Sequence, residues 1–151
     1  MNAGMICSPK VITITPQEDV TTAARLMREK HVGFLVVVEP GAQQADVTVT
    51  GVLTDRDIVT GVIGRDADVH ALKVGDVMTR NPLLTTEEQS VEGTLRDMRA
   101  RGVRRVPVVG DRDELKGVLS LDDILNALAD QLNDVAASIR NEQRVERAVR
   151  R

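Results

Sequence analysis

The sequence predicts an α+β fold in which one supersecondary unit is used twice and is followed by a helical extension. Residues 51–58 return as residues 117–124, and both copies read Gly, two apolar residues, a hydroxyl residue, two variable residues, Asp and Ile. An upstream block also returns at constant spacing: Val20, Arg25, Met27, Arg28, Val32, Val37 and Val38 correspond to Val91, Arg96, Met98, Arg99, Val103, Val108 and Val109. Self-similarity over dozens of residues indicates a repeated structural unit.

The first unit is predicted over residues 3–63, and its first helix shows the clearest period. Three apolar side chains at i, i+4 and i+7 define one helix face: Val20, Ala24 and Met27. Basic residues favoured by the helix dipole place the end of this helix near His31. Residues 1–10 are interpreted as a lead-in. In chain order, the other expected elements are a strand at 11–15, a buried strand at 34–38, a polar hairpin loop at 39–48, a strand at 49–53 and a helix from 54 to about 63.

The second unit is predicted over residues 76–130, after a linker at 64–75. Leu72 and Val74 indicate that this linker packs against the protein. The second unit repeats the plan of the first, with a helix face formed by Val91, Leu95 and Met98. Its other expected elements are a helical turn at 76–78, strands at 83–85, 106–109 and 115–119, a tight turn at 110–113 and a final helix that begins at Ser120.

The final helix is predicted to continue into a C-terminal helical tail at 131–151. An apolar stripe runs past the point where the first unit ends: Ile124, Leu125, Leu128, Leu132, Val135, Ala136 and Ile139. Residues 140–151 then become basic, with five Arg against two Glu. Two interpretations of this basic segment stay open, namely a solvated helix end and a docking surface for a partner chain.

The composition excludes several classes of function. Phe34 is the only aromatic residue and the net charge is −3, so neither base stacking nor a global basic field supports nucleic-acid binding. The single Cys7 rules out an internal disulfide and a cysteine-based metal cage. No apolar run approaches the roughly 20 residues that span a bilayer, and no secretory signal is recognisable. We therefore expect a cytoplasmic protein without membrane contact.

Three motifs in matching contexts resemble the CBS domain pair, also called the Bateman module, in its small stand-alone form. Residues 76–82 (Asp-Val-Met-Thr-Arg-Asn-Pro) are similar to the motif that opens a repeat of this family, and residues 103–109 to its central strand. The repeated stretches at 51–58 and 117–124, here named the closing motifs, are similar to the one that ends it. The resemblance covers roughly residues 3–130. It implies two repeats, each β-α-β-β-α, packed about a pseudo-twofold axis with two clefts between them.

The resemblance also implies an adenosyl ligand in these clefts, such as AMP, ADP, ATP or S-adenosylmethionine. The carboxylate of each closing motif would bind ribose hydroxyls, and its hydroxyl residue would lie near phosphates. The base would rest on main chain and side chains of the opposite repeat. Carried over, the ribose residues are Asp57 and Asp123, the hydroxyl residues are Thr54 and Ser120, and the base-slot residues are Ile14 and Val32 in one cleft and Thr85 and Val103 in the other.

Simple chemistry supports these roles, and it also supports a purely structural alternative. A carboxylate can accept two hydrogen bonds from a cis-diol, and helix N-termini attract anions. The same Ser/Thr-x-x-Asp pattern before an apolar helix is also a capping box that satisfies free backbone N–H groups. The two interpretations are compatible, because a capping residue can also face a ligand.

Arg104 and Arg105 distinguish the two halves of the chain. Adjacent residues on a strand point to opposite faces, so at least one of these arginines is expected to reach a cleft, where a guanidinium suits a phosphate. The first repeat has Gly33 and Phe34 at these positions, so the clefts are expected to differ and Phe34 to narrow one of them. The cleft served by the arginines is expected to prefer the more phosphorylated ligand.

We therefore expect a non-enzymatic sensor that forms a homodimer through its helices and acts on a client protein. No catalytic residues are predicted, because no nucleophile, base and orienting group form a set. No metal is expected either, since His31 and His70 lie far apart in the plan and Asp is common in turns and helix starts. The alternative is a ligand-free interaction module that acts through its helices and basic tail. Nucleic-acid binding through residues 140–151 with Arg104 and Arg105 is a third, weaker hypothesis.

Overall fold

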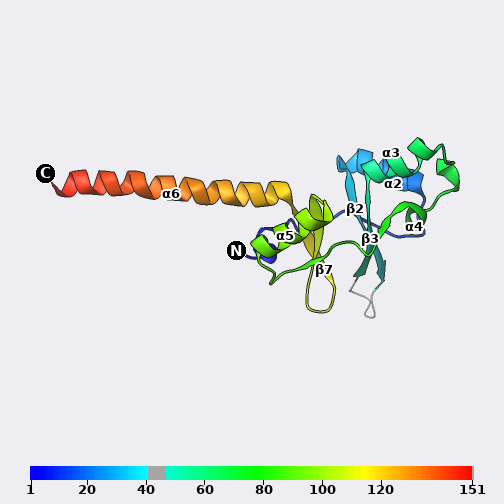
Figure 1. Ribbon diagram of the computed structural model, residues 1–151, viewed down its shortest axis with the longest axis horizontal. Coiled ribbons are helices and arrows are strands. Elements are labelled where there is room, and N and C mark those ends of the chain that lie inside the picture. Colours follow the sequence, from blue (N-terminus) through cyan, green and yellow to red (C-terminus); the bar gives the residue numbers. More distant parts are fainter. Residues whose placement is uncertain (41–46, 151) are drawn as a thin grey trace.

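The computed structural model describes residues 1–40 and 47–150 and has two related sheets, one of four strands and one of three (Figure 1). Most of the loop predicted at 39–48 therefore lies outside the described residues. The helices are α1 Ala3–Ile6, α2 Val20–Lys30, α3 Asp55–Gly61, α4 Val74–Val77, α5 Val91–Arg101 and α6 Leu121–Val149, with 3-10 turns η1 Ile63–Arg65 and η2 Val69–Ala71. The strands are β1 Thr13–Ile14, β2 Phe34–Pro40, β3 Val47–Thr54, β4 Thr79–Arg80, β5 Thr85–Thr86, β6 Arg105–Val109 and β7 Leu115–Ser120.

The two repeats share topology, register and irregularities, which confirms the predicted α+β plan. Elements β1-α2-β2-β3-α3 correspond to β5-α5-β6-β7-α6. In both sheets the first strand pairs in parallel with the second, and the second pairs antiparallel with the third. Ile14 faces Val37 as Thr85 faces Val108, and the register of both central strands shifts immediately after that valine.

The buried faces of α2 and α5 differ by one residue from the prediction. Both helices bury the residue before the predicted one, because Ala23 and Thr94 face the core whereas Ala24 is exposed and Leu95 is 38% exposed. In α5 the sequence misleads because a polar residue, Thr94, occupies a core position, whereas in α2 both candidates are alanine and composition cannot distinguish them. Thr94 is tolerated there because its hydroxyl is hydrogen-bonded.

The first residues of the chain are structural, which corrects their interpretation as a lead-in. Helix α1 packs in the core of the second repeat, where Ala3 is fully buried. Helix α4, which precedes the second repeat in sequence, packs in the core of the first through Val74 and Met78. Each repeat is therefore completed by a segment that precedes the other repeat's sheet.

The first glycine of each closing motif makes room for these crossing segments. Ser8 and Val118 exchange two backbone hydrogen bonds of 2.9 Å, and a Cβ on the neighbouring Gly117 would lie 2.6 Å from the carbonyl oxygen of Ser8. In the first repeat, β4 pairs with β3, and a Cβ on Gly51 would lie 2.8 Å from the carbonyl oxygen of Thr79. Both positions need glycine because another backbone approaches closely.

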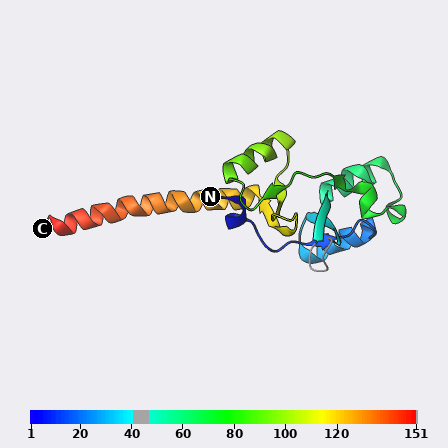
Figure 2. The same cartoon turned by 90° about the horizontal axis from the view of Figure 1, so that it is seen from below.

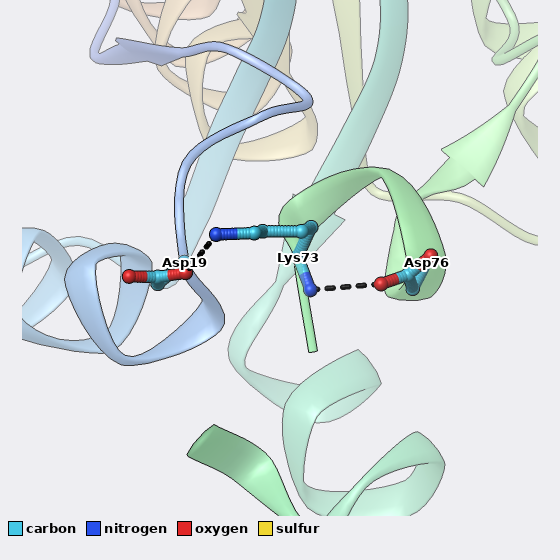
Figure 3. A network of polar contacts seen from close by, with 3 residues as sticks. All are labelled: Asp19, Lys73 and Asp76. Atoms are coloured by element: carbon cyan, nitrogen blue, oxygen red, sulfur yellow. Dashed lines mark hydrogen bonds and ion pairs between the residues drawn. The ribbon is translucent and has the colours of Figure 1, made fainter. Parts of the chain in front are cut away.

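The predicted linker packs against the first repeat, as Leu72 and Val74 indicated. Figure 3 shows Lys73 between two carboxylates: its Nζ lies 2.6 Å from Asp19 Oδ1, and its backbone N–H donates to Asp76 Oδ2 at 2.8 Å. Backbone bonds at Val20 and Val74 flank this contact. The ion pair is about half exposed, so the backbone bonds hold the linker more firmly than the charges do.

Helix α6 leaves the body of the protein as a long single helix. Its first turn is anchored by Ile124, and the remainder extends away from both repeats in two perpendicular views (Figures 1 and 2). The predicted tail is thus a continuation of this helix up to Val149. Within the described part of the chain, every helix is too short or too polar to cross a membrane.

Candidate ligand-binding clefts

Two clefts lie where the repeats meet, and each combines a closing motif with residues of the opposite repeat. The larger cleft, of ≈ 760 Å³, is lined by Thr54 and Asp57 together with Leu83, Val103, Arg104 and Arg105. The smaller cleft, of ≈ 280 Å³, is lined by Ser120 and Asp123 together with Ile12, Val32, Phe34 and Arg105. The structure therefore brings each predicted carboxylate and hydroxyl together with one predicted base-slot valine.

In the larger cleft, Asp57 caps helix α3 and also lines the cleft wall. The backbone N–H of Thr54 donates to Asp57 Oδ2 at 2.9 Å, and the Asp57 N–H donates to Thr54 Oγ1 at 3.0 Å. This reciprocal pair is the capping box expected from the sequence. Within residues 1–40 and 47–150, no protein donor reaches Asp57 Oδ1. One carboxylate oxygen of this cleft-lining residue is therefore without a hydrogen-bond partner from these residues.

The smaller cleft repeats this geometry at Asp123. The backbone N–H of Ser120 donates to Asp123 Oδ2 at 2.8 Å, the Ser120 hydroxyl reaches the same oxygen at 2.8 Å, and the Asp123 N–H donates to Ser120 Oγ at 3.1 Å. The capping and ligand-binding interpretations are thus not exclusive in either repeat. Each carboxylate uses one oxygen for its helix and lies beside an open cleft.

The base-slot residues are divided between cleft wall and core. Val32 and Val103 line the clefts, as the resemblance implied. Ile14 and Thr85, in contrast, face the cores of their own repeats, with 3% and 7% of their surface exposed. The reason is that both pair with a central buried strand and pack under a helix. Other apolar residues, Ile12 and Leu83, supply the cleft walls.

Arginines concentrate in the larger cleft. Arg104 and Arg105 both line it, and three further arginines that the sequence analysis did not single out join them: Arg56, Arg80 and Arg101. Five arginines thus line this cleft together with two acidic residues, Asp55 and Asp57. This excess of positive charge suits a ligand with several phosphate oxygens.

Two of these arginines are oriented by backbone carbonyls. Arg80 Nη2 donates to the carbonyl oxygen of Gly75 at 2.9 Å, and Arg101 Nη2 donates to that of Asn81 at 3.3 Å. Of the three arginines that the sequence analysis did not single out, two could have been found from the motifs. Arg56 lies inside a closing motif, and Arg80 lies inside the motif that opens the second repeat. Arg101 lies at the end of α5 and is brought in by tertiary structure alone.

The smaller cleft is less basic and is lined mostly by residues of the first repeat. Lys10, His31 and Arg105 supply its cationic or titratable groups, against the carboxylate of Asp123. His31 adopts the left-handed conformation (φ 55°) that ends helix α2, which explains its position at the cleft edge. Phe34 lines both clefts and is half-buried, so it separates them rather than filling one.

Cys7 lies near the smaller cleft, but its thiol is expected to be unreactive. Burial raises the pKa of its thiol, and the carboxylates of Glu87 and Asp123 raise it further. A thiol with a raised pKa carries little thiolate at neutral pH and is a poor nucleophile or metal ligand. Across residues 1–40 and 47–150, no three His, Cys, Asp or Glu side chains are grouped closely enough to hold a metal ion.

A family model for the CBS domain matches residues 3–64 and 74–130. The chain belongs to the CBS domain family. Among curated CBS relatives, it is 33% identical over 131 residues to the CBS domain-containing protein YhcV of Bacillus subtilis, covering 85% of either chain. It is 35% identical over 116 residues to the mitochondrial CBS domain-containing protein CBSX3 of Arabidopsis thaliana, covering 76% of this chain and 54% of CBSX3. The match thus spans about half of that relative.

Solved CBS structures superimpose on most of the chain. Hypoxic Response Protein I with two coordinated zinc ions matches with a TM-score of 0.72 and 28% identity, over 84% of this chain and 98% of its own. The CBS domain pair of MJ0100, in complex with 5-methylthioadenosine and S-adenosyl-L-methionine, matches with a TM-score of 0.74 and 21% identity, over 87% and 98%. These likenesses confirm the tandem CBS fold, in which helix α6 closes the second repeat and continues as a C-terminal extension.

Proposed function

We propose that this CBS pair is a non-enzymatic sensor that binds an adenosyl ligand between its repeats. The observation that carries the proposal is the double role of Asp57, which caps α3 with one carboxylate oxygen and lines the larger cleft opposite Val103. A carboxylate with a free oxygen beside an apolar wall suits a ribose attached to a flat base. The MJ0100 pair, a structural neighbour, binds ligands of this adenosyl class.

The charge of the larger cleft points to a phosphorylated member of the class. ADP or ATP would place its phosphates among Arg101, Arg104 and Arg105, whereas the smaller cleft suits AMP or an uncharged adenosyl group. No metal is required in this scheme, because the guanidinium groups supply the positive charge. A bound ligand would favour the arrangement of the two repeats that binds the ligand more tightly, and this shift would change the contact with a client protein. The size of the shift is limited by the difference in ligand affinity between the arrangements.

The same proposal includes a homodimer formed through the helices. Large apolar side chains on helical surfaces of both repeats are exposed: Val59 by 55%, Ile63 by 66% and Leu95 by 38%. We propose that these exposed helical side chains form part of the dimer contact. The lone, partly buried thiol suits a reducing compartment, and we place the protein in the cytoplasm, although its relative CBSX3 is named as mitochondrial.

The test compares ligand binding by variants that keep the helix caps. An Asn in place of Asp57 or Asp123 keeps one carbonyl oxygen for the cap but loses the second acceptor that a diol requires. Thermal shifts would be recorded with AMP, ADP, ATP and S-adenosylmethionine. A site filled at 100 times its Kd adds about 2.7 kcal/mol, or roughly 5–11 °C at this size. We expect the shift to fall in Asp57→Asn or Asp123→Asn and to persist in Asp122→Asn, the matched control.

A different outcome would favour the second candidate function, an interaction module. The observation behind that candidate is the exposed apolar stripe of α6, which no ligand role explains. If no adenosyl ligand stabilises the wild-type protein at millimolar concentration, the sensor proposal fails and Asp57 and Asp123 serve only as caps.

A further inference from the structure

Helix α6 carries an apolar stripe that its own chain leaves uncovered. The stripe consists of residues that are 44–71% exposed and follow one another at alternating steps of three and four: Leu125, Leu128, Leu132, Val135 and Ile139. This alternation is the heptad pattern of the core positions of a coiled coil. Ala129 and Ala136 border the stripe with small side chains, which lets another helix approach closely.

The length of the arm argues that the stripe is covered in the working protein. A protein helix is stabilised mainly by packing of its apolar face against other elements. Side-chain pairs at i,i+3 or i,i+4 along its surface add only a few tenths of a kcal/mol each. Among the described residues of α6, one i,i+4 ion pair is formed, between Arg150 and Glu146. The body of the protein does not cover the stripe, because the arm points away from both repeats (Figures 1 and 2). A partner helix therefore has to supply the packing.

The charges of α6 identify the partner as a second copy of the same helix. The first half of the helix carries Asp122, Asp123, Asp130 and Asp134 without any Lys or Arg. The second half carries Arg140, Arg144, Arg147 and Arg150 against Glu142 and Glu146. One end of the helix is thus complementary to the other end of a copy that runs in the opposite direction.

A parallel arrangement would lose this complementarity. Glu142 and Glu146 continue the heptad after Ile139, so parallel helices would stack each glutamate on its own copy. Antiparallel helices crossing near Leu132 avoid that contact and bring Arg140 close to Asp122 of the other copy. These two residues lie on the same side of α6, because 18 residues make about five turns. A lipid surface fits less well, since the face opposite the stripe is acidic at Asp130 and Asp134.

We propose that the α6 arms of two copies pair as an antiparallel coiled coil over residues 125–139. This pairing is a contact separate from the proposed dimer contact at Val59, Ile63 and Leu95, and it does not depend on ligand binding in the clefts. It would place the two CBS bodies at opposite ends of a shared rod, with the basic end of each arm beside the acidic start of the other.

Spin-label distances on the full chain test both the pairing and its direction. In a Cys7→Ser background, a label at Asn133→Cys lies close to the proposed two-fold axis, so two labels should be separated by roughly 20–25 Å, about two helix diameters. Labels at Val149→Cys should be separated by about 50 Å, because each lies some 17 residues from the axis at 1.5 Å per residue. Labels at 149 within 20 Å of each other would overturn the antiparallel arrangement.

Two substitutions of equal charge control for specificity. Leu132→Glu places a carboxylate in the stripe and should abolish the short distance at 133. Ala137→Glu adds the same charge on the exposed opposite face and should leave it unchanged. The proposal is overturned if the labelled Asn133→Cys protein, without a further substitution in α6, shows no interspin distance at about 100 µM, or if the two variants behave alike. A failure of this proposal can be told from a failure of the sensor function by measuring thermal shifts with adenosyl ligands on Leu132→Glu. Residue 132 does not line either cleft, so ligand stabilisation should be unchanged in this variant.

Discussion

The hydroxyl oxygens of Thr85 and Thr94 lie 2.8 Å apart inside the second repeat. Thr94 also donates to the carbonyl oxygen of Ser90 at 3.0 Å, so the single proton of Thr94 is already used. The Thr85 hydroxyl is therefore the donor of the pair. Both side chains are buried. Removal of the Thr94 hydroxyl would leave the Thr85 donor without a partner, whereas removal of the Thr85 hydroxyl would leave the Thr94 donor bonded to Ser90.

Thr94→Val should lower stability more than Thr85→Val. The first change leaves a buried Thr85 donor unsatisfied, at a cost of about 1–3 kcal/mol, whereas the second keeps the Thr94 bond to Ser90 and costs about 0.5–1.5 kcal/mol. Urea unfolding of both variants and of the double variant measures this order. The double variant should cost less than the sum, since no orphaned hydroxyl remains. The opposite order for the single variants would contradict this assignment of the donor.

Gly117→Ala should destabilise the protein by about 1–3 kcal/mol, as overpacking in a tight region does. The added Cβ would meet the carbonyl oxygen of Ser8 at 2.6 Å, and a backbone atom cannot move aside as a flexible side chain does. The comparison is Gly61→Ala in helix α3, where the nearest atom is Val77 Cγ1 at 3.8 Å and alanine favours the helix. Thermal unfolding of the two variants should shift in opposite directions, and a neutral Gly117→Ala would show that the crossing segment is loose.

The carboxyl group of Glu114 should titrate at unusually low pH. A hydrogen bond from Lys116 and backbone donors, among them the N–H of Arg112, lower the pKa of Glu114 to about 2. Since the pKa is lower in the folded state, the stabilising contribution is complete above the unfolded value near 4.5 and is lost as pH falls towards about 2. Carbon-detected NMR titration reports this directly. Lys116→Met should raise the pKa of Glu114 towards its ordinary value, whereas Asp111→Asn in the same turn should not.

Cys7 should react slowly with alkylating agents at neutral pH. Burial, the largest cause, and the Glu87 carboxylate raise the pKa of its thiol, so the reactive thiolate is scarce. The rate of iodoacetamide labelling against pH should have its midpoint above the ordinary value for cysteine. Glu87→Gln should move that midpoint down without exposing the thiol, and a wild-type midpoint below the ordinary value would contradict the structure.

Arg104→Gln should weaken ATP binding more than AMP binding. The loss of a charge-assisted hydrogen bond to phosphate corresponds to roughly 10–100-fold in affinity, and less if water screens the site. Calorimetry with both nucleotides measures the ratio, and Arg99→Gln, which lies outside both clefts, serves as the control. An equal loss for the two nucleotides would place the β and γ phosphates away from Arg104.

The repeated motifs made the fold predictable, because their local chemistry and their tertiary role coincide. The closing motif is a capping box wherever it stands, so Asp57 and Asp123 could be placed at helix starts from sequence, whereas their place beside the clefts was implied by the family resemblance. Which face of α5 is buried could not be predicted from the sequence. Its core contains Thr94, whose burial depends on the hydroxyl of Thr85 on another element, and periodicity counts such a residue as polar.

Long-range packing accounts for the remaining differences. Helix α1 is a single turn of four residues without a period of its own, so its place in the second core depends on contacts with β5, β7 and α6, which follow much later in the chain. The basic character of the larger cleft is likewise assembled from distant segments, with Arg56 in the first repeat and Arg101 in the second. No window of the sequence contains both.

The crossing of α1 into the second repeat has a consequence during protein synthesis. The first core is complete once residues up to Met78 have emerged, because α4 follows strands β1 to β3 in the chain. Ser8, in contrast, has to wait for Val118, about 110 residues later, which is roughly 6–20 seconds at ribosomal speed. During that delay Ile6 and Cys7 have no core to join. Two fragments separated within residues 64–73 would therefore each lack a helix of their own core, because α1 would stay with the first fragment and α4 with the second. Both fragments should have to be mixed before either repeat folds completely.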